Sequence, residues 1–480
     1  MDRRQFLGLT ATGMMACSLP REGNQASTFT LQKKLPMTQS YDLIVCGGGA
    51  AGVAAALAAG RAGLKVLLAE GQGQLGGMAT SGLVSHWLGG RTTDCLHWAV
   101  GGIFRTMSHE AHRRGFALIP EDDPDGRLSP HGWGRGMLTA GIPFDPYHMA
   151  AYLDELCAEN GVETLFYTQA VEPVVHGDRI THLILYNKSG LQAVPVNAVV
   201  DATGDADIAA RSGCDFEKGR EGDGGVAAAT LQFHASNVDR DKLGAFIHNY
   251  NARRFRDKIA SLRKRGEWTF PYDIFIATQI DKQDVFMINT SRLVGIDGTD
   301  AKSVTEGVIK GRQETIELLR LMRKHFPGFE NARIKAVAPL LGVRESRRIK
   351  GRYRLSVEDL NRQNVFADTI GYSAYGWDLP DPEHPSCNPG HGKRSEVIAI
   401  PYRIMIPAPV GNLICPGRAA SVERPVLGPL RVMAPCMAMG EAAGTATLQV
   451  IGEGKRFDQV DTALLRQRLK SNGAIVEWPV

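Results

Sequence analysis

Early in the chain, an apolar strand runs into a glycine-rich turn, then a helix of small residues, then a second strand that ends at an acid. The strand Leu43–Cys46 leads directly into Gly47-x-Gly49-x-x-Gly52, and Glu70 follows 23 residues after Gly47. A spacing of about 20 residues is expected in a dinucleotide-binding βαβ unit. The first glycine permits a tight turn, the second lets backbone N–H groups approach a pyrophosphate, and the third lets the helix pack closely on the strand. The segment is therefore predicted to bind a dinucleotide.

Hydrophobic patterning along the rest of the chain predicts alternating strands and helices. We expect helices over 146–160, 307–325 and 433–450 from their apolar periodicity. Alternating residues and turn pairs predict a three-stranded meander over 170–196, followed by a separate buried strand over 198–201. The fold class is therefore α/β, with a Rossmann-type nucleotide-binding domain.

Shifts of composition predict the domain organisation. The pattern changes to mixed strands and amphipathic helices after the first nucleotide-binding segment, and no segment repeats. We expect an export signal and disordered tether over 1–40 and a C-terminal tail over 456–480. The nucleotide-binding domain is expected in two parts, 41–213, with a cap or insertion at about 87–144, and 394–455, where the chain returns to it. An inserted α+β substrate domain is expected between them, over 214–393.

Composition excludes several kinds of protein. Hydrophobic residues make up 43% and charged residues 22% of the chain, as in ordinary globular proteins. A net charge of +4 over 480 residues gives no case for a nucleic-acid partner. The eight cysteines show neither a CxxC pair nor a metal-ligand spacing with histidine, so we expect no structural metal and no disulfide framework.

The N-terminal residues indicate export. Arg3 and Arg4 precede Phe6-Leu7 and a short apolar stretch, which is the arrangement of a bacterial twin-arginine signal. The residues before Cys17 also resemble a lipoprotein cleavage site, which makes Cys17 a candidate lipid anchor. The alternative is a ragged terminal tail. We expect a periplasmic or otherwise exported protein, free or anchored to the membrane through a lipid.

Five motifs in order resemble the bacterial family of FAD-dependent oxidoreductases, in the glutathione-reductase-like FAD superfamily and distantly related to fumarate-reductase-type flavoproteins. The resemblance covers about residues 41–455 and implies FAD as the cofactor and a glutathione-reductase-like arrangement of the Rossmann-type domain. It rests on the glycine turn already described, on Leu75–Gly82, on Asp201–Asp207, on Gly342–Gly351, and on Gly417-Arg418 taken with Leu427–Met433.

The resemblance also implies which residues hold FAD. Related flavoproteins usually carry Asp where Arg418 stands, and an arginine is a natural partner for phosphate. The implied contacts are Gly47, Gly49, Ala50, Ala51 and Gly52 at the pyrophosphate; Glu70 and Gly71 at the adenosine ribose; Gly76, Gly77, Met78, Ala79 and Thr80 beside the ribityl chain and flavin ring; Ala170 and Val171 at the adenine; Ala202, Thr203, Gly204 and Asp205 near the adenosine; and Gly417, Arg418, Arg431, Val432 and Met433 by the phosphates, the ribityl chain and the flavin.

The helix that begins near Met433 has a second expected role. Its N-terminus carries unpaired N–H donors and a partial positive charge, which would favour the negative charge of a reduced flavin. Its small residues, such as Gly440 and Gly444, would equally let it pack against the first βαβ unit. Both roles are compatible.

A hydride transfer usually needs an acid or base at the neighbouring heteroatom. We expect the residues that supply it to come from the inserted domain or the cap. His391 is the first candidate, since its loop precedes the return to the nucleotide-binding domain, and His86 is another. Arg344 and Arg347 are candidates to bind a substrate carboxylate or hydroxyls, or else they pair with Glu345 or Glu358. Further candidates are His384, Tyr372, Tyr375 and Tyr402.

Three functions compete at this stage. The first is an FAD-dependent dehydrogenase that takes hydride from a CH–OH group of a sugar or other polar small molecule. The second is a fumarate-reductase-like enzyme acting on C=C bonds beside a carboxylate, and the third is a flavin electron-transfer subunit of a partner complex. No second strand–GxGxxG–helix unit is visible, so we expect the electron acceptor to be a quinone, a redox protein or oxygen rather than a nicotinamide.

Overall fold

The computed structural model describes residues 30–119, 140–250, 255–280, 283–387, 390–391 and 397–478. The predicted α/β class is confirmed by a seven-stranded sheet in the order β5-β2-β1-β8-β7-β6, with β17 beside β8. Its strands β1 and β2 are almost wholly buried, as expected for parallel strands covered on both faces. The parallel part consists of β5 (Val162–Leu165), β2 (Val66–Ala69), β1 (Tyr41–Cys46), the end of β8 (Gly190–Asp201) and β17 (Leu413–Ile414).

Strand β8 corrects one prediction. The third strand of the expected meander and the separate strand expected over 198–201 are a single strand of 12 residues. Its first half pairs antiparallel with β7 (Arg179–Asn187), which pairs in turn with β6 (Gln169–His176), and its second half pairs parallel with β1. The residue pattern changes within one strand because the strand passes from a half-exposed ribbon into the buried middle of the sheet.

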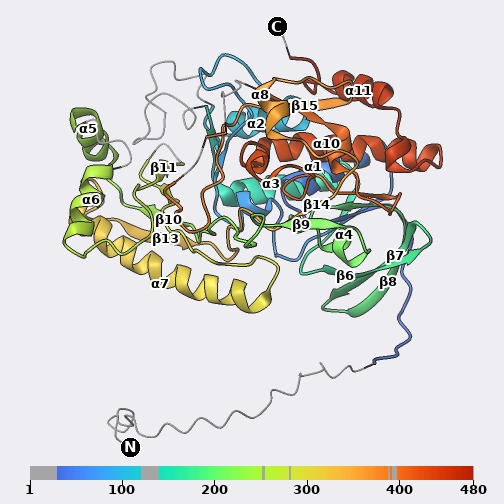
Figure 1. Ribbon diagram of the computed structural model, residues 1–480, viewed down its shortest axis with the longest axis horizontal. Coiled ribbons are helices and arrows are strands. Elements are labelled where there is room, and N and C mark those ends of the chain that lie inside the picture. Colours follow the sequence, from blue (N-terminus) through green and yellow to red (C-terminus); the bar gives the residue numbers. More distant parts are fainter. Residues whose placement is uncertain are drawn as a thin grey trace, which may run out of the picture. The chain divides into compact units, whose positions relative to one another are not determined.

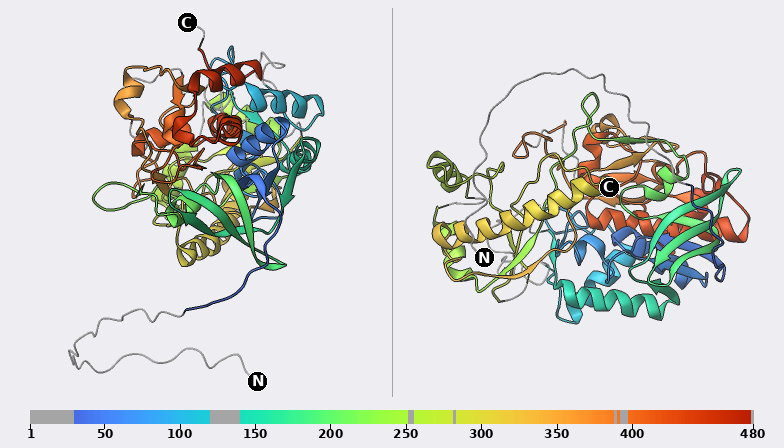
Figure 2. Two further views of the ribbon diagram at one scale, coloured as in Figure 1. Left: turned by 90° about the vertical axis from the view of Figure 1, so that its right-hand side faces the viewer. Right: turned by 90° about the horizontal axis from the view of Figure 1, so that it is seen from below.

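Helices α1 (Ala50–Arg61) and α10 (Met433–Gly452) lie side by side in Figure 1, and the views in Figure 2 agree. A Cβ atom on Gly440 would lie 2.0 Å from the carbonyl oxygen of Ala51, and one on Gly444 would lie 2.2 Å from that of Ala55. Only glycine therefore allows the two backbones to come this close. The predicted final helix is confirmed, as is its packing on the first βαβ unit.

A second, four-stranded sheet in the order β11-β12-β10-β13 has its own core. In Figure 1 the yellow helix α7 (Ala301–His325) runs along β10 and β13, and Leu318, Leu321 and Met322 of α7 are buried in this core. Helix α7 starts six residues before its predicted start because the side chain of Asp300 caps its first turn. The other elements here are β11 (Ala277–Gln279), β12 (Phe286–Ile288), β10 (Phe233–Ser236), β13 (Arg333–Val337), α5 (Arg240–Tyr250) and α6 (Arg256–Lys264).

The predicted C-terminal tail contains a helix, α11 (Thr462–Ser471), whose Leu465 and Leu469 are fully buried. Residues 36–480 form one compact unit, and the domain boundaries within it stay predictions. The remaining helices and strands are β3 (His86–Trp87), α2 (Gly102–Arg113), β4 (Ile142–Pro143), α3 (Pro146–Glu159), α4 (Asp207–Arg211), β9 (Phe216–Lys218), β14 (Arg347–Ile349), α8 (Val357–Asn361), β15 (Thr369–Ser373), β16 (Ile398–Pro401) and α9 (Leu427–Leu430).

The residues behind the export prediction, Arg3, Arg4 and Cys17, lie outside the described part of the chain. Among the helices that are described, none combines the length and the apolar character that a membrane crossing needs. The seven cysteines of the described ranges are free thiols, and these ranges hold no group of three or more residues suited to a metal ion.

Glu441 is a charged residue buried in the middle of α10, with only 3% of its surface exposed. Its Oε2 accepts a hydrogen bond of 3.0 Å from the backbone N–H of Ile103, in the first turn of α2. Burial raises the pKa of this carboxyl to about 7, although the bond from Ile103 opposes the rise. The folded protein therefore holds this proton at pH values where the unfolded chain has released it.

We expect Glu441 to make stability fall as pH rises from about 4.5 to about 7. Below this window the carboxyl is protonated in both states, and above it the folded protein bears the full cost of a buried charge. In Glu441→Gln, which stays neutral and keeps an acceptor for Ile103, this fall should shrink by on the order of 1–3 kcal/mol. Urea unfolding at several pH values measures it, with Glu453→Gln at the exposed end of α10 as the control. Equal pH profiles for Glu441→Gln and the wild type would contradict the assignment.

Candidate active site

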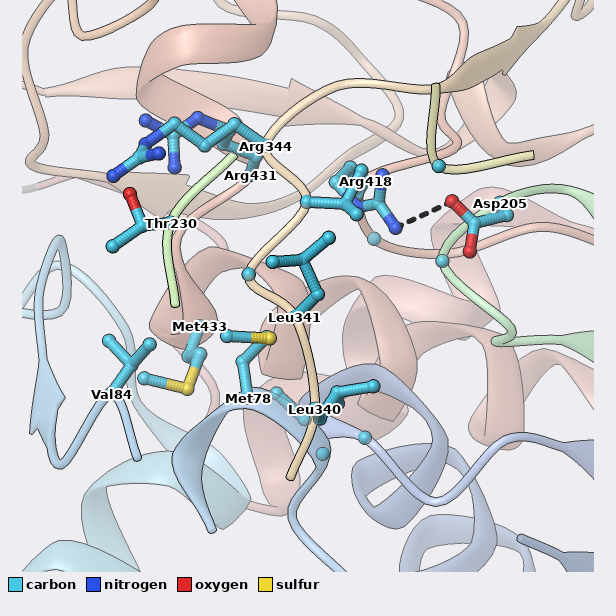
Figure 3. Close-up of a pocket in the computed structure, with 18 of the residues that line it drawn as sticks. Met78, Val84, Asp205, Thr230, Leu340, Leu341, Arg344, Arg418, Arg431 and Met433 are labelled. Carbon is cyan, nitrogen blue, oxygen red and sulfur yellow. Dashed lines mark hydrogen bonds and ion pairs between the residues drawn. The ribbon is translucent and has the colours of Figure 1, made fainter. Parts of the chain in front are cut away.

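A cavity of about 1020 Å³ runs from the glycine turn after β1 to the second sheet. Both sheets and the segment before α10 contribute to its wall, so residues far apart in the sequence face one another across it (Figure 3). One end is lined by the predicted dinucleotide-binding segments. The other end is lined by arginine and tyrosine side chains around Thr230.

The glycine turn has the geometry that an anion site requires. Gly47 has φ +101°, which side-chain-bearing residues rarely adopt, and a Cβ on Gly52 would lie 1.8 Å from the carbonyl oxygen of Gly47. A Cβ on Gly49, by contrast, would meet no protein atom within 4 Å, because this residue faces the cavity. No side chain caps the N-terminus of α1. Its N–H donors are therefore open to a negatively charged group such as a pyrophosphate.

Glu70 lines the cavity as predicted, and its carboxylate also holds the turn together. Oε2 accepts a hydrogen bond of 2.5 Å from the N–H of Gly48, and Oε1 accepts one of 2.7 Å from the N–H of Gln72. Burial raises the pKa of this carboxyl, and the backbone donors oppose the rise. An ionised carboxylate has about four acceptor positions, so these bonds are compatible with a further bond to a ribose hydroxyl.

Most of the other predicted cofactor residues line the same cavity. Four of them do not line it: Gly52, Gly76, Ala79 and Thr80. Gly52 packs against Gly47, and the side chains of Ala79 and Thr80 are buried. Those that line it are Gly47, Gly49, Ala50, Ala51, Glu70, Gly71, Gly77, Met78, Ala170, Val171, Ala202, Thr203, Gly204, Asp205, Gly417, Arg418, Arg431, Val432 and Met433.

The buried carboxylate of Asp201 accepts hydrogen bonds from the Ala202–Asp205 turn and from the helix that follows it. Its Oδ1 accepts a hydrogen bond of 2.6 Å from the Thr203 hydroxyl, and its Oδ2 accepts bonds of 2.9 Å from the N–H groups of Ile208 and Ala209 in α4. The carboxylate thus fixes the end of β8 to the start of the next helix. Asp201 was part of a sequence motif, and the structure gives it this positioning role.

Arg418 lines the cavity and is ion-paired, and its expected place beside phosphate stays a prediction. Its Nη2 donates to Oδ1 of Asp205 over 2.8 Å, drawn as a dashed line in Figure 3, and its Nη1 donates to Oγ of Ser346 over 2.8 Å. Asp205 neutralises the Arg418 guanidinium, and the uncapped N-terminus of α1 remains an anion-attracting feature of this part of the wall.

An apolar patch lies between the two ends of the cavity. Figure 3 shows Met78, Met433, Val84 and the leucines Leu340 and Leu341 around one space. The N-terminus of α10 opens here, since Val432 caps it without a side-chain bond and both Val432 and Met433 line the cavity. A flat aromatic ring with a negative edge suits apolar walls and a helix N-terminus.

Of the four candidate catalytic residues, Arg344 and His86 line the cavity, whereas Arg347 and His391 do not. The guanidinium of Arg347 pairs with Asp207 over 2.9 Å and with neither Glu345 nor Glu358. The ring of His391 packs edge-on against Trp377 at 5.5 Å between centroids, and His391 is not part of the cavity wall. The further candidates divide in the same way: Tyr375 lines the cavity, Tyr372 and Tyr402 are buried in the core, and His384 lines a separate surface cavity.

Tyr375 forms a hydrogen-bonded group with a residue that the sequence did not single out, Asp378. The Tyr375 hydroxyl donates to Oδ2 of Asp378 over 2.9 Å, and Nη2 of Arg431 donates to the same oxygen over 3.1 Å. Burial by itself raises the pKa of Asp378, but Arg431 and Arg344 outweigh burial and hold that pKa below its ordinary value. Burial and the charge of Asp378 raise the pKa of Tyr375 well above its ordinary value. Tyr375 therefore stays protonated while Asp378 stays ionised.

Arg292, Asn289, Thr230 and Tyr272 also line this end of the cavity and were missed. The guanidinium of Arg292 stacks over the Tyr272 ring at 3.9 Å from its centroid. These side chains come from separate segments of the second sheet and its loops, so no local motif brings them together. The sequence therefore contains no local signal that identifies these four residues as one site.

The fold and the cavity together define a dinucleotide-dependent redox enzyme: an open helix end beside a glycine turn, an apolar patch, and a polar end with an ionised carboxylate. Residues 42–469 match the protein family described as FAD dependent oxidoreductase. The protein belongs to this family, and it is an enzyme that uses FAD. When bound, FAD supplies the two-electron acceptor, and the chain supplies orientation, proton transfer and substrate recognition.

Several solved structures resemble the chain at low sequence identity. A geranylgeranyl bacteriochlorophyll reductase-like protein from Thermoplasma acidophilum is 14% identical, with 90% of this chain and 83% of that chain covered and a TM-score of 0.45. The p-nitrophenol 4-monooxygenase PnpA from Pseudomonas putida DLL-E4 is 15% identical, with 91% and 89% covered and a TM-score of 0.44. The flavin-dependent brominase Bmp2 is 14% identical, with 90% and 84% covered and a TM-score of 0.47.

We expect Gly49→Val to lose FAD without losing the fold. The backbone of Gly49 (φ −72°, ψ −173°) is open to valine, and its Cβ would point into the cavity where the pyrophosphate is predicted. The FAD-to-protein ratio of the purified variant should therefore fall severalfold, while circular dichroism stays that of the wild type. Gly390→Val, whose Cβ also meets no atom within 4 Å and which lies outside the cavity, is the control. A Gly49→Val protein with stoichiometric flavin would refute the placement.

Proposed function

We propose that the enzyme is a dehydrogenase that oxidises a CH–OH group of a sugar or other polar small molecule, with FAD as hydride acceptor. The observation that carries this proposal is the pair formed by Tyr375 and Asp378 in the cavity wall. Oxidation of an alcohol releases a hydride from carbon and a proton from oxygen. The chain must therefore offer a proton acceptor, and an ionised carboxylate is one.

Asp378 suits the acceptor role better than a donor role. The positive charges of Arg431 and Arg344 keep its pKa low despite burial, so it carries no proton to give at neutral pH. Tyr375 donates to Asp378, which orients the carboxylate in the cavity. Arg431 binds both the side chain and the carbonyl oxygen of Asp378, at 3.1 and 2.7 Å, and holds it in place.

A second candidate is a C=C oxidoreductase acting beside a carboxylate, and the arginines around Thr230 favour it. Guanidinium groups recognise carboxylates well. Reduction of a C=C bond also needs a proton donor, and the ionised state of Asp378 supports the alcohol reaction instead. We also propose that the protein is related to the glutathione-reductase-like superfamily and, more distantly, to fumarate-reductase-type flavoproteins. This proposal rests on the order of the five motifs in the sequence. The role of electron-transfer subunit has no structural observation in its favour.

We expect anaerobic bleaching of the flavin to identify the reaction. A panel of sugars, hydroxy acids, enoates, NADH and NADPH is mixed with the oxidised enzyme, and only CH–OH compounds should reduce it. With the best of these, Asp378→Asn should slow flavin reduction by about 10²–10⁴-fold, because the amide cannot accept the proton. FAD content should be unchanged. Asp381→Asn, which pairs with Arg220 outside the cavity, is the control. Undiminished reduction in Asp378→Asn would eliminate the assigned base. Reoxidation of the dithionite-reduced flavin by enoates, with no bleaching of the oxidised flavin by any alcohol, would favour the second candidate.

The export of the protein and its electron acceptor are proposals drawn from the sequence. We propose a periplasmic or otherwise exported enzyme, with Cys17 a candidate lipid anchor, that passes electrons to a quinone, a redox protein or oxygen. Arg3 and Arg4 motivate the export route. Replacing both by lysine should leave the protein in the cytoplasmic fraction of the cell, and secretion equal to that of the parent would exclude a twin-arginine route.

A further inference from the structure

Three arginines meet at the end of the cavity beyond the apolar patch: Arg292, Arg344 and Arg431. Nη1 of Arg292 and Nη2 of Arg344 both donate to Oδ1 of Asn289, each over 3.3 Å, so one neutral oxygen holds two guanidinium groups. Figure 3 shows Arg344 and Arg431 side by side next to Thr230, apart from the paired Arg418 and Asp205. We call these three side chains the arginine cluster.

Within the described part of the chain, the arginine cluster carries more positive charge than the acidic side chains of the cavity wall compensate. Among the described acidic residues of the cavity wall, Asp378 is the one that contacts any of the three arginines, through Arg431. The other four acids have partners elsewhere: Glu70 at the N–H of Gly48, Asp205 at Arg418, Asp207 at Arg347, and Asp300 at the N–H of Ser303. Three guanidinium groups therefore face one carboxylate, which leaves a surplus of two positive charges.

The remaining contacts of Arg292 and Arg344 are with neutral oxygens. Arg292, with 3% of its surface exposed, donates to the carbonyl oxygens of Ser291 and Asn289 over 2.8 and 3.1 Å. Arg344 donates to the carbonyl oxygen of Ala228 over 2.5 Å. Burial, together with the charges of Arg292 and Arg431, lowers the pKa of Arg344 well below its ordinary value. Buried like charges are costly unless an opposite charge is bound between them.

We propose that the arginine cluster binds a carboxylate of the substrate, so that the enzyme oxidises a hydroxy acid or a sugar acid rather than a neutral sugar. The planar guanidinium groups match a carboxylate in shape and charge. The reaction itself rests on the proposed function, whereas the charge of the ligand rests on the arginines alone. Because Arg431 contacts Asp378, a hydroxyl that gives its proton to Asp378 lies near the carboxylate that Arg431 holds. This neighbourhood favours a hydroxyl close to the acid group.

The probes for this proposal are 2-hydroxyisobutyrate and its neutral amide, 2-hydroxyisobutyramide. The two have nearly the same shape and differ in charge, and neither has a hydrogen on the carbinol carbon, so neither can be oxidised there. Binding to the oxidised holoenzyme is measured by the change in the visible absorption of FAD. We expect the wild type to bind the acid at least 10-fold more tightly than the amide.

Arg344→Gln should weaken binding of the acid by about 10- to 100-fold, the range for losing one charge-assisted hydrogen bond, and should leave the amide unchanged. Arg344→Lys keeps the charge and should retain part of the affinity. Arg354→Gln, an exposed arginine paired with Glu217, is the matched control and should bind both probes as the wild type does. If Arg344→Gln does not fold or loses FAD, the comparison of the two probes in the wild type decides alone.

Equal or absent binding of the acid and the amide by the wild type would overturn the proposal. So would an Arg344→Gln enzyme that binds the acid normally but has an altered flavin reduction potential, because the arginines would then serve the cofactor. The two proposals fail separately. Tight binding of the acid without bleaching by any alcohol rejects the dehydrogenase reaction only, and bleaching by neutral sugars without binding of the acid rejects the carboxylate substrate only.

Discussion

The close contact between α1 and α10 is the constraint on which the cavity depends. Gly440 and Gly444 bring α10 against the carbonyl oxygens of Ala51 and Ala55, at a distance that any side chain would prevent. Both helices begin at the cavity without a side-chain cap, α1 after the glycine turn and α10 after Val432. Two helix N-termini, each with a partial positive charge, are thereby fixed relative to each other. A cofactor with a pyrophosphate at one point and a reducible ring at another needs such a fixed separation.

The two ends of the cavity recognise charge by different means. At the dinucleotide end, Glu70 already bonds the turn and Arg418 already pairs with Asp205. We expect the backbone N–H groups at the start of α1 to bind the negative charge of the cofactor there. At the other end, the arginine cluster has surplus charge on side chains. Substitutions of these side chains can change which ligand binds at this end without touching the glycine turn.

Signals that lie close together in the sequence predicted most of the fold. The strand, glycine turn and terminal acid identified the first unit, and apolar periodicity identified α7 and α10 (Figure 1). The errors arose where tertiary surroundings decide. Strand β8 changes neighbours midway, which its residue pattern shows as two strands. His391 was chosen for its place in the chain, yet its ring packs on Trp377. Arg344 and Tyr375 were named from the sequence, but their neighbours Asn289 and Asp378 were not, because these residues come from separate segments and meet only in the folded chain.

The continuity of β8 links a surface feature to the interior. Its first half is paired with β7 in the half-exposed meander, and it ends at Asp201, before the turn that is predicted to lie near the adenosine. Successive side chains of a strand point to opposite faces, so the direction of Asp201 toward α4 requires that the pairing of β8 with β7 and its pairing with β1 agree in register. One strand therefore connects a hairpin on the protein surface to the turn at the cavity. Its pairing with β7 at one end and with β1 at the other sets how far the chain extends toward that turn.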